Sequence, residues 1–147
     1  MNLPKYVPPA DTVRQLISQH ARLKPNAIYA VFPETKSVLT YKNLEQEAQE
    51  YATQFNALGL VQGDTISFMI GNGKTALVLF LSALYTGLII SPLNPAAGPE
   101  QIAYVLQHSD TKVVFISAAS KSLVLSLGDK LPKQIQFIDA HEDHGPS

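Results

Sequence analysis

Hydrophobic and polar positions divide the chain into blocks, and the block at residues 63–95 has the clearest pattern. It contains a short apolar run, a helix-length run that is apolar on every side, and a second short run, separated by glycine-containing turns. Short apolar runs without strict alternation are typical of parallel strands buried on both faces, and the longer run is typical of a fully covered helix. The block therefore predicts a right-handed β-α-β unit. Its three runs cover residues 65–70, 75–85 and 88–93.

Upstream of this block, the pattern predicts two amphipathic helices and a hairpin. One helix follows Thr12 and a longer one follows Thr40, because a threonine hydroxyl can accept a hydrogen bond from the first helical amides. The β-prone runs 28–32 and 38–41 flank a proline-containing turn, which predicts the hairpin. Residues 1–11 carry three prolines and predict an extended arm. The apolar helix positions are Val13, Leu16, Ile17 and Ala21, and then Tyr41, Leu44, Ala48, Tyr51, Ala52, Phe55 and Leu58.

Downstream of the block, helix and strand signals continue to alternate. A helix is expected from Pro99, a strand at residues 112–116, a short helix after Ser120 and a last strand at residues 135–138. Residues 139–147 have little apolar content and predict a frayed tail. This order predicts a single domain over the whole chain. Its expected class is an α/β fold of three layers, with a mostly parallel sheet, helices on both faces and a small N-terminal hairpin.

Composition excludes several classes of function. The net charge is −1, from 11 basic and 12 acidic residues, so the chain has no basic footprint for nucleic acid or an anionic membrane surface. It has no cysteine, and therefore no disulfide, thiolate nucleophile or zinc–thiolate site. Residues 76–93 approach the length of a membrane span, but Gly87, Ser91 and Pro92 interrupt them, which favours a buried helix and strand. The N-terminus lacks the apolar core of a signal peptide, which predicts a cytoplasmic protein.

The turn at residues 71–76 lies between a predicted strand and a predicted helix, where phosphate groups often bind. Its sequence, Gly-Asn-Gly-Lys-Thr-Ala, can be read as a dinucleotide fingerprint, in which amides at the start of a helix hold a pyrophosphate. That fingerprint also needs an acid about 20 residues further on, where this chain has Asn94. A P-loop would need a glycine in place of Phe68. The simplest interpretation is a tight strand-to-helix bend that the glycines permit, and dinucleotide binding stays an alternative.

Other groups with metal-binding or catalytic chemistry have simpler explanations. Two imidazoles and two carboxylates lie together in the tail, but a zinc or nickel site needs a fixed backbone, and a frayed tail favours solvated side chains. The segment 117–122 has hydroxyls and a lysine but no glycine, which favours a loop and helix cap. His20 and His108 lie late in their helices, where an imidazole suits the helix dipole. The residues alone therefore assign no catalytic, cofactor-binding or metal-binding position. The tail groups are His141, Glu142, Asp143 and His144.

Three stretches, in this order and at this spacing, resemble the N-terminal portion of the AMP-forming acyl- and aryl-adenylating ligases. That superfamily includes acyl-CoA synthetases, firefly luciferase and the adenylation domains of peptide synthetases. The sequence Pro92-Leu93-Asn94-Pro95 is closer to the acyl-CoA synthetases than to the peptide synthetases. The three stretches are LTYKNLEQEAQEYATQFNALGLVQGD (39–64), SFMIGNGKTALVLFLSALYTGLIISPLNP (67–95) and PEQIAYVLQHSDTKVVF (99–115).

The resemblance implies a parent enzyme that uses ATP and Mg²⁺ to convert a carboxylic acid, expected to be a fatty acid, into an acyl-adenylate. A thiol such as coenzyme A then displaces AMP. The family's phosphate loop, Mg²⁺-holding acid, ribose-binding aspartate and catalytic lysine have no counterpart in this sequence. No site residue of the family is therefore assigned to a position here. We predict an N-terminal fragment that binds no cofactor, is inactive alone, and has the remainder of the ligase chain as its partner.

Two alternatives stay open. The first is a small nucleotide-binding module that uses residues 71–76, and the second is a non-catalytic interaction domain. A lobe of a larger fold would leave bare the apolar surface that the missing part covers, which predicts self-association. No nucleic-acid partner and no membrane span are expected.

Overall fold

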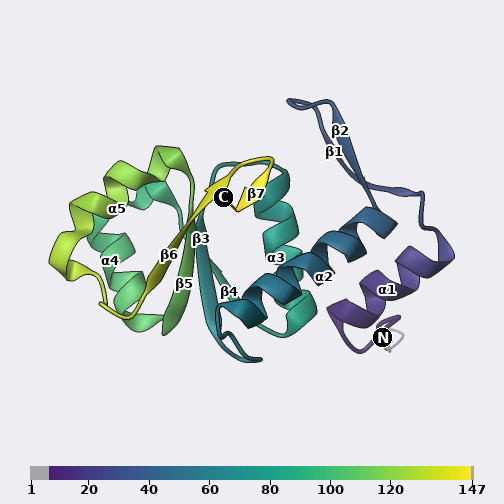
Figure 1. The fold of residues 1–147 in the computed structure, drawn as a ribbon, viewed down its shortest axis with the longest axis horizontal. Helices are drawn as coiled ribbons and strands as arrows, with labels where there is room; N and C mark the ends of the chain where they lie inside the picture. The colour runs from purple at the N-terminus through teal and green to yellow at the C-terminus, as the bar shows by residue number, and fades with distance from the viewer. Residues whose placement is uncertain (1–6, 147) are drawn as a thin grey trace, which may run out of the picture.

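A five-stranded sheet lies at the centre of the molecule, with the strand order β4-β3-β5-β6-β7 (Figure 1). The computed structural model describes residues 7–146. Strands β3 to β6 run parallel, and β7 pairs antiparallel with β6. These strands are β3 (Thr65–Met69), β4 (Ile89–Pro92), β5 (Thr111–Ile116), β6 (Gln136–His141) and β7 (Gly145–Pro146).

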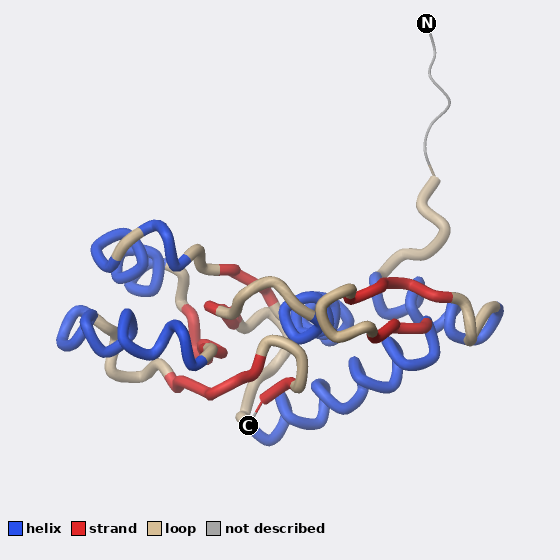
Figure 2. The backbone as a smooth tube through the Cα atoms, turned by 90° about the horizontal axis from the view of Figure 1, so that it is seen from above, coloured by secondary structure: helices blue, strands red, loops and turns tan. Residues whose placement is uncertain are grey.

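The helices form two groups, one on each side of the strands (Figure 2). Side chains of β5 alternate between the groups: Val113 and Phe115 pack in the cluster with α1, α2 and α3, whereas Val114 and Ile116 pack in the cluster with α4 and α5. A strand covered on both faces produces this alternation. The three-layer α/β class predicted from the sequence is therefore confirmed. The helices are α1 (Val13–Leu23), α2 (Tyr41–Ala57), α3 (Lys74–Thr86), α4 (Pro99–His108) and α5 (Lys121–Leu127), with 3-10 turns η1 (Pro95–Ala97), η2 (Ala118–Ser120) and η3 (Gly128–Lys130).

The central β3-α3-β4 unit forms as its hydrophobic pattern predicts. Thr65 of β3 is in register with Ile89 of β4. Helix α3 is buried on several sides and ends at Gly87, whose φ of 78° lies in the left-handed region that favours glycine. Thus the glycine stop lets the chain turn back into the sheet within a few residues.

The N-terminal hairpin and the helix caps also form as predicted. β1 (Ile28–Phe32) pairs antiparallel with β2 (Ser37–Thr40). The side chains of Thr12 and Thr40 accept hydrogen bonds from the backbone amides of Gln15 and Asn43 at the starts of α1 and α2. Of the expected arm at residues 1–11, residues 1–6 lie outside the described residues, and residues 7–11 belong to no helix or strand.

The expectation of a frayed tail from residue 139 differs from the structure. The last parallel strand runs on to His141, and a turn brings Gly145 back to pair with it. The Thr75 amide donates to the Glu142 carbonyl oxygen at 2.8 Å, and the Gly145 amide donates to Thr75 Oγ1 at 2.9 Å. Backbone hydrogen bonds and the burial of Ala140 hold this C-terminal hairpin, residues 139–146, so its polar composition is a poor guide to its order.

The membrane interpretation of residues 76–93 can also be checked against the helices. No helix within residues 7–146 is long and apolar enough to cross a bilayer.

Candidate functional site: the pocket between α2, α3 and the C-terminal hairpin

The N-terminus of α3 is occupied by the protein's own chain. The turn at residues 71–76 lies between β3 and α3 as expected. However, the Lys74 amide donates to Asp143 Oδ1 at 3.2 Å, and the Thr75 amide donates to the Glu142 carbonyl oxygen. These are amides that a pyrophosphate would need. A nucleotide could use them only by displacing the hairpin, so the geometry weighs against the dinucleotide interpretation.

The space around Gly73 leaves no room for a side chain in this turn. A Cβ atom at this position would lie 2.5 Å from the Glu142 carbonyl oxygen, which is closer than real contacts allow. Its φ of 171° is extended backbone that any residue can adopt. The glycine is therefore needed for the close approach of the hairpin backbone and not for an unusual conformation.

The segments that follow β3 and β5, where the strand order reverses, are hydrogen-bonded to each other. In doubly wound sheets, ligands bind outside the carboxyl ends of the strands at this reversal, here between β3 and β5. The Ser117 amide donates to the Met69 carbonyl oxygen at 3.1 Å, and Ser120 Oγ donates to the same oxygen at 2.9 Å. Residues 117–122, which the sequence predicted to be a loop and helix cap, are thus hydrogen-bonded to the end of β3. These hydrogen bonds continue the β3–β5 pairing beyond Met69 and Ile116 and hold the two segments directly against each other.

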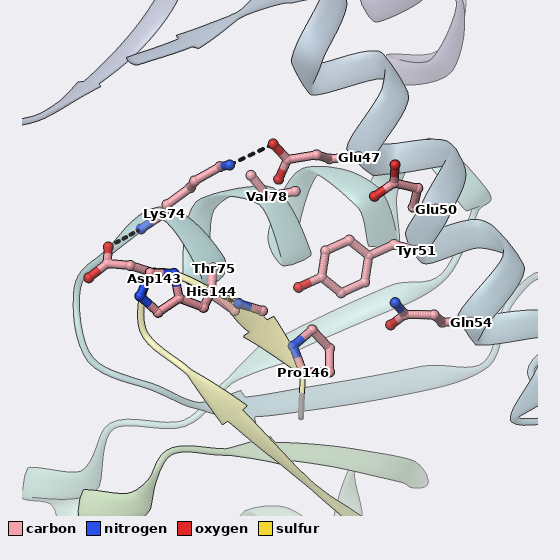
Figure 3. Close-up of a pocket in the computed structure, with 11 residues that line it drawn as sticks. Glu47, Glu50, Tyr51, Gln54, Lys74, Thr75, Val78, Asp143, His144 and Pro146 are labelled. Carbon is pink, nitrogen blue, oxygen red and sulfur yellow. Dashed lines mark hydrogen bonds and ion pairs between the residues drawn. The ribbon is translucent and has the colours of Figure 1, made fainter. Parts of the chain in front are cut away.

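A pocket of about 330 Å³ opens beside the start of α3 (Figure 3). One wall is the face of α2 that carries residues at steps of three and four, which a helix places on one side. The other walls are the first turn of α3 and the turn of the C-terminal hairpin. The lining residues are Glu47, Glu50, Tyr51, Gln54, Lys74, Thr75, Val78, Asp143, His144, Gly145 and Pro146.

The charges of this pocket disfavour a phosphate ligand. Lys74 Nζ lies 2.6 Å from Glu47 Oε1, so the lysine of the turn is paired within the protein. Glu50 and Asp143 add two further carboxylates to the lining. Negative charge in a cleft repels anions and attracts cations or neutral donors. Lys74 is therefore the ion-pair partner of a helix carboxylate in this structure.

Tyr51 supplies the one buried hydroxyl in the pocket wall that lacks a partner within residues 7–146. Its side chain points into the pocket (Figure 3), and only 6% of the residue is exposed. Burial first, and then the nearby Glu47 carboxylate, raise the pKa of the Tyr51 phenol well above its ordinary value. The hydroxyl therefore stays protonated and can serve as a hydrogen-bond donor, not as a base.

The histidine and carboxylate groups of the tail form a turn and not a ligand set. The rings of His141 and His144 stack with centroids 4.5 Å apart, and the Asp143 amide donates to His141 Nδ1 at 3.1 Å. Within residues 7–146, no three metal-ligating side chains converge. His20 and His108 contact Tyr41 and Tyr104 respectively, in keeping with helix-end packing roles.

Sequence reasoning missed this pocket. Its α2 wall could have been found from the helical spacing of Glu47, Glu50, Tyr51 and Gln54. Its other walls could not, because the hairpin turn and the start of α3 are about seventy residues apart in the chain, as in the Lys74–Asp143 contact.

The fold and the pocket together define a doubly wound α/β lobe whose carboxyl edge is closed by its own chain. The sequence profile of the AMP-binding enzyme family matches residues 17–145, and the chain belongs to that family. The predicted membership is thereby confirmed.

Characterised relatives of the chain are much longer ligases and synthetases. It is 31% identical over 135 residues to the sulfoacetate–CoA ligase of Cupriavidus necator, which covers 89% of this chain and 26% of that ligase. It is 27% identical over 109 residues to the long-chain-fatty-acid–CoA ligase FadD13 of Mycobacterium tuberculosis, covering 74% of this chain and 22% of that ligase. A 28% identical match to tyrocidine synthase 2 of Brevibacillus parabrevis covers 72% of this chain and 3% of the synthase. The chain therefore spans about a quarter or less of each of these relatives.

Solved structures confirm the fold. The N-terminal domain of FACL13 from Mycobacterium tuberculosis superposes with a TM-score of 0.83 at 24% identity, covering 89% of this chain and 34% of that domain. The acetoacetyl-CoA synthetase from Streptomyces lividans gives a TM-score of 0.77 at 20% identity, covering 89% of this chain and 22% of that synthetase. The chain thus has the fold of part of the N-terminal domain of an acyl-CoA synthetase.

Proposed function

We propose that this chain is the N-terminal lobe of an AMP-forming acid–thiol ligase and serves that enzyme as scaffold. In the complete ligase, a carboxylate attacks the α-phosphate of ATP, pyrophosphate leaves, and a thiol then displaces AMP from the acyl-adenylate. ATP, Mg²⁺ and coenzyme A belong to the complete enzyme, and the lobe alone binds none of them and is inactive. A fatty acid is the proposed substrate, because FadD13 is a long-chain-fatty-acid–CoA ligase by name. We place the ligase in the cytoplasm, where ATP and thiol acceptors are both available.

The observation that carries this proposal is the closed carboxyl edge of the sheet. A nucleotide-binding α/β domain keeps this edge open to ligand. Here the Thr75 amide, the Lys74 amide and the Met69 carbonyl oxygen are all satisfied by nearby segments of the same chain. Together with the family match over residues 17–145, this supports a framework role for the lobe.

The test is an ATP–pyrophosphate exchange assay with the chain alone and with the chain co-expressed with the unmatched remainder of the Cupriavidus necator ligase. Exchange is measured with palmitate, hexanoate and sulfoacetate as acids. We expect no exchange from the chain alone and acid-dependent exchange from the pair. The intact relative is the positive control. Exchange by the chain alone would refute the scaffold role, and a tight but inactive pair would favour a non-catalytic interaction domain.

A calorimetric titration separates the proposal from the nucleotide-module alternative. ATP and NADH are titrated into the chain alone at equal concentrations. We expect no heat of binding for either ligand, because the amides at the start of α3 are engaged. Micromolar binding of NADH that is lost on mutation of the turn at residues 71–76 would establish the alternative.

Self-association of the isolated lobe is a further part of the proposal. Several large apolar side chains are exposed, including Val31 and Val38, which lie opposite each other across the β1–β2 hairpin. Exposed apolar surface favours association in water. Multi-angle light scattering over a hundredfold range of about 1–100 µM should give a mass that rises with concentration toward a dimer. A constant monomer mass would contradict it.

A further inference from the structure

The pocket beside the start of α3 has two carboxylates that no cationic side chain neutralises. Its volume of about 330 Å³ lies near the lower end of the usual range for ligand sites. The charges of Glu47 and Lys74 cancel, because these two side chains form an ion pair. Glu50 and Asp143, by contrast, form no ion pair within residues 7–146. The pocket therefore favours a positively charged ligand.

Tyr51 gives a second and independent indication of a ligand. Its hydroxyl is buried and has no hydrogen-bond partner within residues 7–146, and the side chain, which is 6% exposed, points into the pocket (Figure 3). A buried polar group without a partner is costly, and native proteins keep few of them. Because the phenol stays protonated, it can donate a hydrogen bond to a ligand atom. The ligand that satisfies Tyr51 therefore carries a hydrogen-bond acceptor.

The same lining disfavours several other classes of ligand. Phosphates, nucleotides, amino acids and phospholipid head groups carry negative charge, which the carboxylates of the lining repel. A metal ion needs several ligating side chains, and no three converge within the part of the chain that the structure describes, residues 7–146. The carbon atoms of an organic ligand, in contrast, can pack against Val78, Pro146 and the Tyr51 ring.

We propose that this pocket binds a small amine that carries hydroxyl groups, with its ammonium group at Glu50 and Asp143 and a hydroxyl oxygen at Tyr51. The hairpin turn screens the Tyr51 hydroxyl: a Cβ atom at Gly145 would lie 3.7 Å from its oxygen, and water barely reaches it. The turn at residues 143–145 therefore moves outward slightly as the ligand enters. The inference goes beyond the scaffold role and does not depend on it, because the ligand is neither ATP nor the acid substrate.

The test is a titration of the isotope-labelled chain with three matched compounds, followed by amide NMR in an amine-free buffer. Diethanolamine carries both the ammonium group and the hydroxyls. Dipropylamine has methyl groups in place of the hydroxyls, and diethylene glycol has an ether oxygen in place of the amine. The pocket variants are Tyr51→Phe and Glu50→Gln. Glu45→Gln is the control, because it removes the same charge from α2 at a residue outside the lining.

We expect diethanolamine to shift the amide signals of residues 74–78 and 143–145 until they saturate, and to bind about tenfold more tightly than either matched compound. Tyr51→Phe should lower the affinity for diethanolamine by about tenfold and leave that for dipropylamine unchanged, because only the hydroxyl contact is lost. Glu50→Gln should weaken both amines by about fivefold, and Glu45→Gln should change either affinity by less than about twofold.

Three results would overturn the site. Without a saturable shift by diethanolamine the pocket has no such ligand, and the scaffold role still stands. An unchanged affinity of Tyr51→Phe for diethanolamine would show that the hydroxyl makes no contact, and tighter binding of diethylene glycol would show that positive charge is not required. Urea midpoints check folding. Tyr51→Phe should be at least as stable as the unmodified chain without ligand, so unfolding would not explain its lower affinity.

Discussion

The two ends of the parallel strands, called here the carboxyl edge and the amino edge of the sheet, are held to neighbouring segments in different ways. At the carboxyl edge, backbone atoms and buried hydroxyls are satisfied by nearby loops: Thr75 by the C-terminal hairpin, and the Met69 carbonyl oxygen by Ser117 and Ser120. At the amino edge, an ion pair between Asp64 and the half-exposed Lys112 links β5 to the loop before β3. Exposed ion pairs contribute little to stability, whereas buried polar groups are costly to leave unpaired.

The comparison shows which groups at the carboxyl ends of the strands are hydrogen-bonded within the chain. The carboxyl edge is the usual ligand-binding edge of an α/β sheet. In this chain its backbone groups are hydrogen-bonded to the C-terminal hairpin and to residues 117–120, and Glu47, Glu50 and Asp143 line the pocket beside it. Substitutions near the carboxyl ends and at the amino ends of the strands test this comparison.

The largest effect is expected from Gly73→Ala. The new methyl group would meet the Glu142 carbonyl oxygen at 2.5 Å, a backbone atom that cannot move without displacing the hairpin. We expect a loss of about 2–3 kcal/mol in the free energy of unfolding, as for other overpacked sites. Urea unfolding monitored by circular dichroism measures it. Gly71→Ala is the matched control, since its nearest neighbour is the Glu142 side chain at 3.4 Å, and it should cost much less. Equal losses for the two variants would show that the close approach at residue 73 is unimportant.

A smaller loss is expected from Ser120→Ala. The change removes the hydroxyl that donates to the Met69 carbonyl oxygen at 2.9 Å in a buried position. That oxygen keeps the Ser117 amide, so the expected loss is about 1 kcal/mol. Chemical unfolding measures this loss too, and Ser126→Ala, at an exposed serine of α5, is the control. If Ser120→Ala lowers the free energy of unfolding by less than Ser126→Ala does, the hydrogen bond from Ser120 to the Met69 carbonyl oxygen adds nothing to stability.

Tyr51→Phe should act in the opposite direction. The variant removes a buried hydroxyl that has no partner within residues 7–146, so we expect a gain of up to about 1 kcal/mol at neutral pH. Because the folded pKa of Tyr51 is raised, the unfolded chain loses this proton first as pH rises above about 10, and stability falls there. The phenylalanine variant should lose that part of the alkaline decline. Thermal melts from pH 7 to pH 11 measure both effects, and a destabilised variant at pH 7 would indicate that the hydroxyl has an essential partner.

The smallest effect is expected at the amino edge. The hydrogen bond from Lys112, and then the Val61 amide, lower the pKa of the Asp64 carboxyl below its ordinary value. A depressed folded pKa contributes stability above the unfolded pKa of about 3.9 and loses it as pH falls through the folded pKa. Asp64→Asn should therefore be slightly less stable than the unmodified chain at pH 7 and equal to it at the acid end of the titration. A difference that is constant with pH, measured by urea midpoints from pH 2 to pH 7, would rule out this charge effect.

The amino-acid sequence by itself determined the elements whose cause is local. The β3-α3-β4 unit, the amphipathic α2 and the caps at Thr12 and Thr40 follow from periodicity and capping chemistry within a few residues. The mostly parallel sheet followed from their order. The sequence also indicated the family. Each matching stretch consists mainly of packing residues, but the order and spacing of the stretches together are characteristic of the family.

Only the tertiary structure decided what the turn at residues 71–76 does. The same glycines could have bent around a ligand, but Gly73 instead receives the backbone of Glu142, a residue with no apolar or periodic signal. The order of the C-terminal hairpin and the pairing of Lys74 with Glu47 also depend on tertiary contacts. Each depends on atoms far apart in the chain, and local sequence patterns carry no information about which distant backbone atoms will accept the hydrogen bonds of the first amides of a helix.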